Sequence, residues 1–200
     1  MDDAALFRYL DVLERRGREN DARETERSRR LLNSGPETGR LLAILVRALG
    51  ARRILELGTS NGYSTLWLAW AAASTGGRVT TVDRAADKVA MARENLARVG
   101  MADRVTVVQR PIADVLRDLP APVDFVFLDA DRPSYLAYLD PLLRALRRGG
   151  LLATDNVVSH ASEVAEFLGL LRATDGLETL TLPLENGVEL TYRYAGPSLA

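Results

Sequence analysis

The chain has 200 residues, 47% of them hydrophobic and 26% charged, which is enough apolar surface for the core of one globular domain over residues 1–200. Its formal net charge of −1 at pH 7 excludes a strong overall field that would attract nucleic acid or an anionic membrane. The absence of cysteine excludes disulfides, thiolate nucleophiles and cysteine-ligated zinc.

Apolar stretches are short throughout the sequence. The opening residues, MDDAALFRYL, are acidic and lack the apolar run of a secretory signal. The longest apolar stretches, such as LWLAWAAA, are too short to cross a bilayer. We therefore expect a cytoplasmic protein without a membrane partner.

Residues 1–34 form a predicted N-terminal helical segment that precedes a cofactor-binding core over residues 36–200. Helix-forming residues and the lack of proline predict a helix or helix pair over 3–32, with Gly17 as the candidate break. Acids interleave with arginines through RRGRENDARETERSRR, which favours a solvated helix face over an RNA-binding arm. The turn sequence NSGP (33–36) places its proline at the start of the next helix.

Beyond this turn, short β-type runs alternate with helical patterns. This βαβα order, with continuous apolar strands, favours a parallel sheet covered by helices on both faces. The predicted strands lie at 52–58, 78–83, 104–109, 123–130 and 150–156, and the predicted helices near 62–74, 85–99, 112–119, 133–147 and 160–174.

The C-terminal end departs from this alternation. Two β-type runs, LETLTLP and VELTYRY, flank the pair Asn186-Gly187, and Asn-Gly is typical of a β-hairpin. The prediction is therefore an α/β doubly wound, Rossmann-like sheet that is mostly parallel and closes with an antiparallel C-terminal hairpin.

The loop after the first strand has the features of a cofactor site, because ligands of doubly wound sheets bind at the carboxyl ends of the strands. Gly58 and Gly62 bracket a tight loop before a helix start that suits a carboxylate or phosphate. Asp83, at the end of the second strand, could accept from ribose hydroxyls, and Glu56 could face a ligand ammonium. Ser60 stands where a dinucleotide motif has its close glycine, so the loop favours S-adenosylmethionine over a nicotinamide cofactor.

Oxygen ligands follow the fourth and fifth strands. Asp129 ends one strand, and Asp155 with Asn156 ends the next, so the three side chains are expected at the same sheet edge. Carboxylate and amide oxygens form the hard donor set that Mg²⁺ binds, with positions left for water or substrate. The sequence thus predicts a site for Mg²⁺, or another divalent cation such as Mn²⁺ or Ca²⁺, beside the cofactor loop.

Four stretches in order, LELGTSNGYSTLWLA, VTTVD, FVFLDADRPSYLAYL and GGLLATDNV, together resemble the cation-dependent O-methyltransferases of the catechol and caffeoyl-coenzyme A type. The resemblance runs from about residue 36 to the C-terminal hairpin. It implies a seven-stranded sheet, a homodimer, and methyl transfer from S-adenosylmethionine to a phenolic small molecule. In such a reaction the cation chelates both oxygens of a vicinal diphenol.

The resemblance also assigns roles to residues. It makes Asp129, Asp155 and Asn156 the metal ligands, and it places Ser64 near the cofactor carboxylate and Asp83 on the ribose. The full set of expected cofactor-binding residues is Glu56, Gly58, Ser60, Gly62, Tyr63, Ser64, Asp83, Arg84, Ile112 and Asp129.

The chain departs from the family pattern at the general base. Relatives usually have lysine where Arg132 stands, and arginine keeps its proton in proteins. Lys88, the only lysine, lies on the helix after the second strand and is in the wrong place to replace it. His160, the only histidine, follows Asn156 by four residues. Arg132 and His160 are therefore the candidate catalytic residues.

We hypothesise that His160 is the base or an added metal ligand, against the alternative of an ordinary solvent-facing histidine. A third option needs no side-chain base, because the metal alone could acidify the phenol and water could take the proton. Arg110-Pro111 is a second departure, since relatives tend to have Gly-Asp there. Ile112 is still expected to form an apolar wall beside the adenine.

Three other functions fit parts of the sequence. A tRNA methyltransferase acting on a hydroxylated uridine-type base predicts a basic surface near the pocket, and the interleaved acids of residues 15–30 weaken the only candidate. A protein that binds S-adenosylmethionine without turnover is suggested by Arg132. A nicotinamide dehydrogenase is disfavoured by the loop at 58–62.

Overall fold

Mostly apolar sequences place β1 and β4 in the interior of a sheet, because a strand covered on both faces is buried along its length. All residues of β1 except the first are buried, and β4 is buried at every position but Asp124. The edge strand β6 instead alternates half-buried with exposed residues over most of its length. The computed structural model describes residues 2–120 and 122–194.

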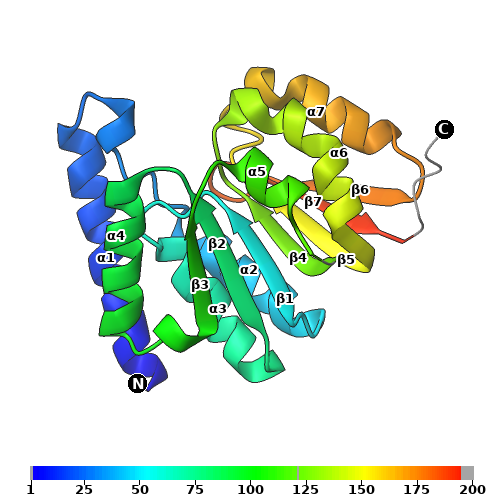
Figure 1. Cartoon of the computed structure of the whole chain (residues 1–200). Helices are drawn as coiled ribbons and strands as arrows, with labels where there is room; N and C mark the ends of the chain where they lie inside the picture. Colours follow the sequence, from blue (N-terminus) through cyan, green and yellow to red (C-terminus); the bar gives the residue numbers. More distant parts are fainter. Residues whose placement is uncertain (1, 121, 195–200) are drawn as a thin grey trace.

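After α1, the chain alternates helices and strands from α2 to α7 and then continues into two strands (Figure 1). The strands are β1 (Arg53–Leu57), β2 (Arg78–Asp83), β3 (Val105–Gln109), β4 (Val123–Leu128), β5 (Leu146–Thr154), β6 (Leu177–Leu182) and β7 (Val188–Arg193). The α-helices are α1 (Asp3–Arg23), α2 (Pro36–Ala48), α3 (Tyr63–Thr75), α4 (Ala86–Arg98), α5 (Ile112–Arg117), α6 (Tyr135–Ala145) and α7 (Ala161–Ala173). Short 3₁₀ helices are η1 (Arg27–Arg29), η2 (Ala102–Arg104) and η3 (Arg132–Ser134).

The seven strands form one sheet in the order β3-β2-β1-β4-β5-β7-β6. All pairs among β1 to β5 are parallel, whereas β7 runs antiparallel to both β5 and β6. The predicted Rossmann-like sheet with an antiparallel C-terminal hairpin is therefore confirmed. The strand order reverses between β1 and β4, and ligands of such sheets bind beyond the carboxyl ends of the strands at this reversal.

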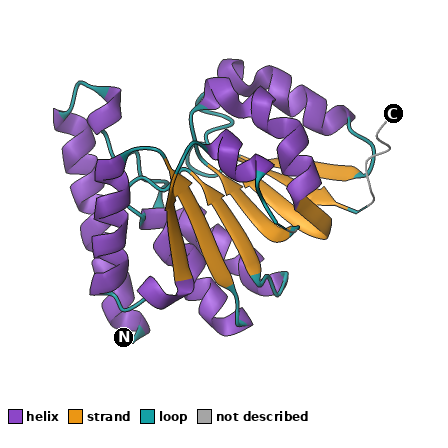
Figure 2. Ribbon diagram, in the orientation of Figure 1, coloured by secondary structure: helices purple, strands orange, loops and turns teal. Residues whose placement is uncertain are grey.

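Helices cover both faces of the sheet (Figure 2). Helices α1 to α4 contribute to one buried apolar cluster, and α5 to α7 contribute to the other. Three leucines of α1, Leu6, Leu10 and Leu13, are buried in the first cluster, so the N-terminal segment packs onto the core. Among the described residues, no helix combines the length and apolar character needed to cross a membrane.

Two local predictions were wrong. Gly17 does not break α1 but lies buried within it, where a Cβ would come 2.5 Å from Nδ2 of Asn33. The missing side chain lets the returning chain pack against the helix, and Asn33 Nδ2 donates to the carbonyl of Leu13 at 3.2 Å. Strand β5 begins at Leu146 rather than 150, because a register irregularity against β4 accommodates Gly149, whose φ is 72°.

Candidate active site

The carboxyl ends of β1, β4 and β5 continue their pairing one residue past each strand. The backbone N–H groups of Gly58, Asp129 and Asp155 donate to carbonyls of neighbouring strands at 3.0, 2.9 and 3.0 Å. Both aspartates were predicted to lie inside the strands, and they instead lie directly after them. Because the sheet holds their backbones, these side chains start from fixed positions at one edge.

Gly58 brings the first loop against the end of β4. Its φ is 106°, and a Cβ at this position would lie 1.9 Å from the carbonyl oxygen of Asp129. Only glycine fits both this backbone conformation and this close approach. The contact places the predicted cofactor loop directly beside the first predicted metal ligand.

The backbone around Ser60 holds the carboxylate of Asp83. The N–H of Ser60 donates to Oδ2 of Asp83 at 3.0 Å, and the N–H of Ala85 donates to Oδ1 at 2.9 Å. Ser60 and Gly62 both have positive φ, 45° and 84°, which folds the loop back before α3 begins. Asp83 is half-buried, so it is oriented by the chain and still accessible from outside.

Glu56 lies deeper than predicted, fully buried beneath the loop. Its carboxylate accepts hydrogen bonds from the hydroxyls of Ser64 at 2.6 Å, Thr81 at 2.6 Å and Thr65. Burial raises the pKa of Glu56 to about 7, although these three hydrogen bonds oppose the rise. The proposed contact between Glu56 and a ligand ammonium stays a prediction, because here the chain's own hydroxyls bind this carboxylate.

The other predicted cofactor residues lie around the same edge. Tyr63 begins α3 and is buried, which raises its pKa to about 12. Arg84, directly after β2, is exposed. Ile112 begins α5 and packs as a half-buried side chain against the second apolar cluster. Their contacts with a cofactor stay predictions.

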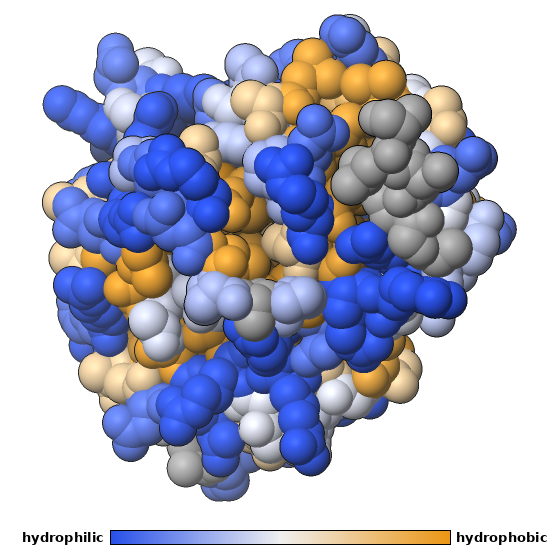
Figure 3. Space-filling view, turned by 45° about the vertical axis from the view of Figure 1, so that its right-hand side comes forward, coloured by the Kyte–Doolittle hydropathy of each residue, from blue (hydrophilic) through white to orange (hydrophobic). Residues whose placement is uncertain are grey.

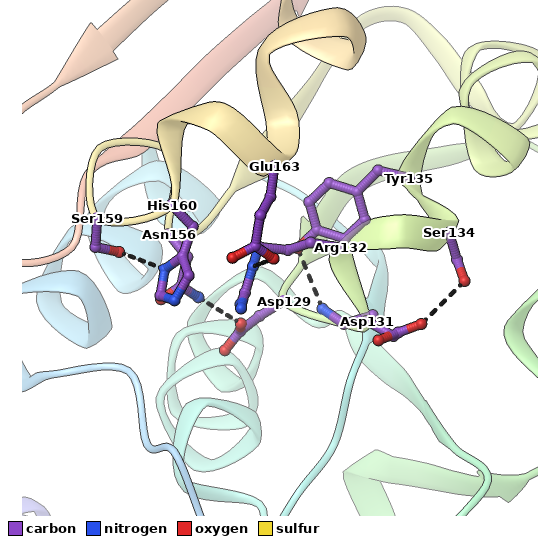
Figure 4. A network of polar contacts seen from close by, with 10 residues as sticks. Asp129, Asp131, Arg132, Ser134, Tyr135, Asn156, Ser159, His160 and Glu163 are labelled. Atoms are coloured by element: carbon purple, nitrogen blue, oxygen red, sulfur yellow. Dashed lines mark hydrogen bonds and ion pairs between the residues drawn. The ribbon is translucent and has the colours of Figure 1, made fainter. Parts of the chain in front are cut away.

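The predicted metal ligands come together at the ends of β4 and β5. Asn156 Nδ2 donates to Oδ1 of Asp129 at 2.8 Å, and the backbone N–H of Asn156 donates to Oδ1 of Asp155 at 2.9 Å. Asn156 has a φ of 65°, a left-handed conformation that asparagine tolerates better than most residues. Figure 4 shows Asp129 and Asn156 facing one another.

The electrostatics of this cluster suit a divalent cation. Burial and the charges of Asp155 and Glu56 raise the pKa of Asp129 well above its ordinary value, against the influence of Arg132 and Asn156. Burial also raises the pKa of Asp155 to about 6. A bound cation would relieve both penalties, and half a turn of the Asn156 amide would present its oxygen as a third ligand.

No cluster of three His, Cys, Asp or Glu side chains that could hold a metal occurs in residues 2–120 and 122–194. The predicted set differs from such a cluster because its third member is an amide. The donor chemistry of Asp129, Asp155 and Asn156 therefore fits Mg²⁺, which binds through few protein ligands and retains water. Metal binding itself stays a prediction.

The two candidate catalytic residues flank this cluster (Figure 4). Arg132 is buried, and its Nε donates to Oε2 of Glu163 on α7 at 2.9 Å. His160 is half-buried at the N-cap of α7, and its Nδ1 lies 2.8 Å from the hydroxyl oxygen of Ser159. The backbone N–H of His160 donates to the carbonyl of Asn156 at 3.2 Å. The structure thus places His160 beside the candidate metal site and leaves its role open to experiment.

The segment after α1 reaches the cofactor loop, which sequence patterns did not predict. The hydroxyl of Ser60 donates to the carbonyl of Leu31 at 2.6 Å, and Nζ of Lys88 donates to the carbonyl of Arg30 at 2.7 Å. Asp21 accepts from the backbone N–H groups of Leu31 and Leu32 at 2.6 and 2.8 Å. These contacts fix residues 30–32 beside the loop that precedes α3.

Glu163 is the main site residue that the sequence did not reveal. It lies in the first turn of α7, where an acidic residue is ordinary because it favours the helix N-terminus. Its contact with Arg132 spans 31 positions in the sequence. The only available signal was Arg132 itself, since an arginine at a strand end requires an acidic partner if it is buried.

A cavity of about 490 Å³ lies away from this site, between α5 and the strands β1 to β3. Four arginines surround it, Arg52, Arg53, Arg78 and Arg110, with an apolar floor that includes Leu55 and Val123. Figure 3 shows apolar surface recessed between hydrophilic side chains on one face of the molecule. The cavity contains none of the predicted site residues, so we assign it no part in the candidate site.

Comparisons with known proteins find O-methyltransferases. A family model described as O-methyltransferase matches residues 13–189. A catechol O-methyltransferase of Mycobacterium tuberculosis is 43% identical over 131 residues, which are 65% of this chain and 59% of that protein. Caffeoyl-CoA O-methyltransferase 1 of Zea mays is 29% identical over 187 residues, 82% of this chain and 72% of that protein. The matches to the first two curated relatives span 59% and 62% of their lengths.

Solved structures give the same result. The O-methyltransferase of Bacillus cereus, in complex with SAH, is 30% identical and has a TM-score of 0.77, with 96% of this chain and 91% of that chain covered. The O-methyltransferase TomG of Streptomyces achromogenes, in complex with SAM, is 28% identical with a TM-score of 0.80 and coverage of 98% and 91%. The similarity therefore extends over nearly the whole fold.

Proposed function

Because this chain belongs to the O-methyltransferase family whose model matches residues 13–189, we propose that it transfers the methyl group of S-adenosylmethionine to a hydroxyl of a catechol-like small molecule. In this proposal Asp129, Asp155 and Asn156 would hold a divalent cation, which would supply chelation of the two acceptor oxygens. One observation carries it: the close contact between Gly58 and the carbonyl of Asp129 puts the cofactor loop and the hard oxygen cluster side by side. A methyl donor and a chelated oxygen need this adjacency for in-line transfer.

The end of β2 and the loop after β1 bind the cofactor in this proposal. Asp83 accepts hydrogen bonds from the ribose hydroxyls, since two backbone N–H groups already orient its carboxylate. Gly58 allows close approach of the ligand to the backbone, and the N-terminus of α3 faces its carboxylate. Relatives of known structure that are described as complexes with SAM or SAH support this part of the proposal.

The ends of β4 and β5 bind the acceptor. Asp129, Asp155 and Asn156 would hold the cation, which when bound supplies Lewis acidity that lowers the phenol pKa from its ordinary value of about 10. The carboxylates fix the acceptor position relative to the cofactor loop, because the sheet fixes their backbones. Bidentate chelation also explains selection of a vicinal pair of oxygens over a single phenol.

The phenolic proton needs an acceptor other than Arg132, which stays protonated. His160 lies at the rim of the cluster, where a substrate oxygen could reach it directly or through one water. If His160 is the base, His160→Ala lowers kcat by about 100-fold and leaves cation affinity unchanged. Unchanged turnover and cation affinity in this variant would instead assign the proton to water.

We also propose a homodimer formed through the open face of β6 and β7. Thr181 and Glu189 accept hydrogen bonds from Arg172, so their side chains lie on the face of the sheet that α7 covers. The neighbouring residues along these strands point to the opposite face. There Leu180 is 60% exposed and Tyr192 is 41% exposed. Light scattering should give the mass of two chains for the wild type, and Leu180→Lys should give one chain if this face is the interface.

The experiment that tests the function measures methyl transfer from labelled S-adenosylmethionine to vicinal diphenols, with Mg²⁺ and then with EDTA. We expect transfer that EDTA abolishes, and little transfer to matched monophenols. Transfer to monophenols at the same rate without metal would contradict chelation. Cofactor binding without transfer to any diphenol would instead direct the search to a hydroxylated RNA base or to a binding protein without turnover.

A further inference from the structure

Arg132 is the only buried arginine among the described residues, at 6% exposure. A buried charge is costly unless it is paired, so a simple exchange of surface lysine for arginine does not explain its position. Its side chain comes from η3, after the end of β4, and it lies beside Asp129 (Figure 4). The guanidinium of Arg132 therefore lies at the edge of the cluster that is proposed to bind the acceptor.

Glu163 binds Arg132 from only one side. The ion pair joins Nε of Arg132 to Oε2 of Glu163 at 2.9 Å, and the two side chains are 5% and 43% exposed. No other hydrogen bond from Arg132 to a described residue is present. The N–H groups of its two terminal nitrogens are therefore available to bind a ligand. Figure 4 shows the end of the guanidinium directed toward Asp129 and Asn156.

A lysine could not make the same arrangement. Guanidinium presents five N–H donors in a rigid fork, so one edge can bind Glu163 while the terminal nitrogens face the site. An ammonium has a single nitrogen and would have to divide its donors between Glu163 and an acceptor oxygen. The position of Glu163 on α7 therefore suits an arginine, rather than a lysine, at position 132.

Resting on the proposed function, we propose that Glu163 is a positioning residue that aims Arg132 at the acceptor oxygen. Arg132 then stabilises the negative charge of the phenolate and takes no part in proton transfer. The acceptor O–H loses its proton to His160 or water. The phenolate oxygen forms the new bond to the methyl carbon as the bond from that carbon to sulfur breaks. The electron pair of the broken bond goes to sulfur, which leaves as the neutral thioether.

The ionisation of a bound phenol tests this without turnover. The probe is 4-nitrocatechol, whose absorption changes when it ionises, bound with Mg²⁺ to the protein carrying S-adenosylhomocysteine. We expect Glu163→Gln to raise the pH at which the bound probe ionises by about one unit, and Arg132→Ala to raise it at least as far. Glu166→Gln removes an exposed acid from the same helix and should leave the value unchanged.

The direction of the shift separates positioning from simple charge balance. If Glu163 only contributed a negative charge, its removal would lower the ionisation pH of the probe, and that result would overturn the proposal, as would an unchanged value. Glu163→Asp keeps the carboxylate on a shorter side chain and should recover part of the shift. The recovery also distinguishes positioning from misfolding, because both variants lack the native glutamate.

Kinetics provide the second readout. Glu163→Gln should lower kcat for a diphenol about tenfold, with the KM for S-adenosylmethionine and the cation affinity unchanged. In an Arg132→Ala background, Glu163→Gln should have no further effect, since the two residues act as a unit. If the wild type neither binds the probe nor methylates any diphenol, the proposed function fails; if the wild type does both and Glu163→Gln matches it, only the inference on Glu163 fails.

Discussion

The two halves of the candidate site differ in how many hydrogen bonds their carboxylates accept from the chain. At the ends of β1 and β2, Glu56 accepts from three hydroxyls and Asp83 accepts from two backbone N–H groups. At the ends of β4 and β5, Asp129 accepts from one side-chain amide, and Asp155 accepts from one backbone N–H of the next residue. A carboxylate offers about four acceptor positions, so the second half keeps most of its oxygen lone pairs uncommitted.

This difference indicates what each half does. The carboxylates of the first half already accept hydrogen bonds from the chain itself, which suits the proposed contact with an uncharged ribose. The second half brings together two acids whose ionisation burial opposes, with Asp155 adding to the rise in the pKa of Asp129. A cation would complete such a cluster in the proposed function. Selective damage to one half or the other is therefore the most direct test.

Gly58→Ala should damage both halves at once and have the largest effect. The new Cβ would lie 1.9 Å from the carbonyl oxygen of Asp129, at a φ of 106° that alanine avoids. We expect a loss of about 3 kcal/mol or more in unfolding free energy, measured by urea denaturation. Gly169→Ala, where a helical Cβ meets open space, should instead stabilise by about 0.5–1 kcal/mol. Equal stability of the two variants would contradict the close contact.

Asp155→Asn should affect only the second half. Removing a charged ligand should lower methyl transfer by more than about 100-fold and abolish cation binding, since even outer-shell changes cost 10–100-fold. Calorimetry should show cofactor affinity within about twofold of the wild type. Asp140→Asn, an exposed aspartate of α6, serves as the control. Loss of cofactor binding in Asp155→Asn would show that the halves are not separable.

Asp83→Ala should affect only the first half. Loss of hydrogen bonds from the ribose to a charged acceptor should weaken cofactor binding by about 10–100-fold, with cation affinity unchanged. The matched control is Asp87→Ala, an exposed residue in the first turn of α4. If both variants bind S-adenosylmethionine as the wild type does, Asp83 does not contact the ribose.

Glu56 should affect stability over only part of the pH range. Its pKa is about 7 in the folded protein because of burial, above the ordinary value of 4.5, so the folded state binds more protons between these values. Stability is then fully present below pH 4.5 and falls as pH rises toward 7, by up to about 1.4 kcal/mol per pH unit. Glu56→Gln should flatten this part of the curve of melting temperature against pH. Parallel curves for the two proteins would show that folding does not raise the pKa of Glu56.

The sequence predicted the parts of the molecule that follow from local pattern. Apolar runs and their order gave the sheet, and the shared edge of parallel strands brought Asp129, Asp155 and Asn156 together. The depth of Glu56 was missed, because the hydroxyls that bind it come from α3 and β2. The role of Glu185 at the start of α2 was missed for the same reason. Its carboxylate accepts from the N–H groups of Glu37 and Thr38, which are 148 and 147 positions away in the sequence.

The continuous course of α1 and the position of residues 30–32 also depend on distant contacts. Gly17 reads as a helix breaker until Asn33 is known to pack against it. Nothing in the sequence pattern indicates that Asp21, Ser60 and Lys88 all hydrogen-bond the same short segment, residues 30–32. Tertiary packing decides such cases, and no local spacing encodes it.

The single lysine gives the molecule a built-in chemical reporter. Lys88 is buried, with 6% of the residue exposed, and its Nζ donates to the carbonyl of Arg30. An amine-reactive label can reach it only when residues 30–32 leave the cofactor loop. The rate at which that one side chain is acylated therefore reports how often this segment opens. Peptide mass spectrometry follows it, because it separates the labelled lysine from the labelled α-amino group, and no other side chain of the protein is a lysine.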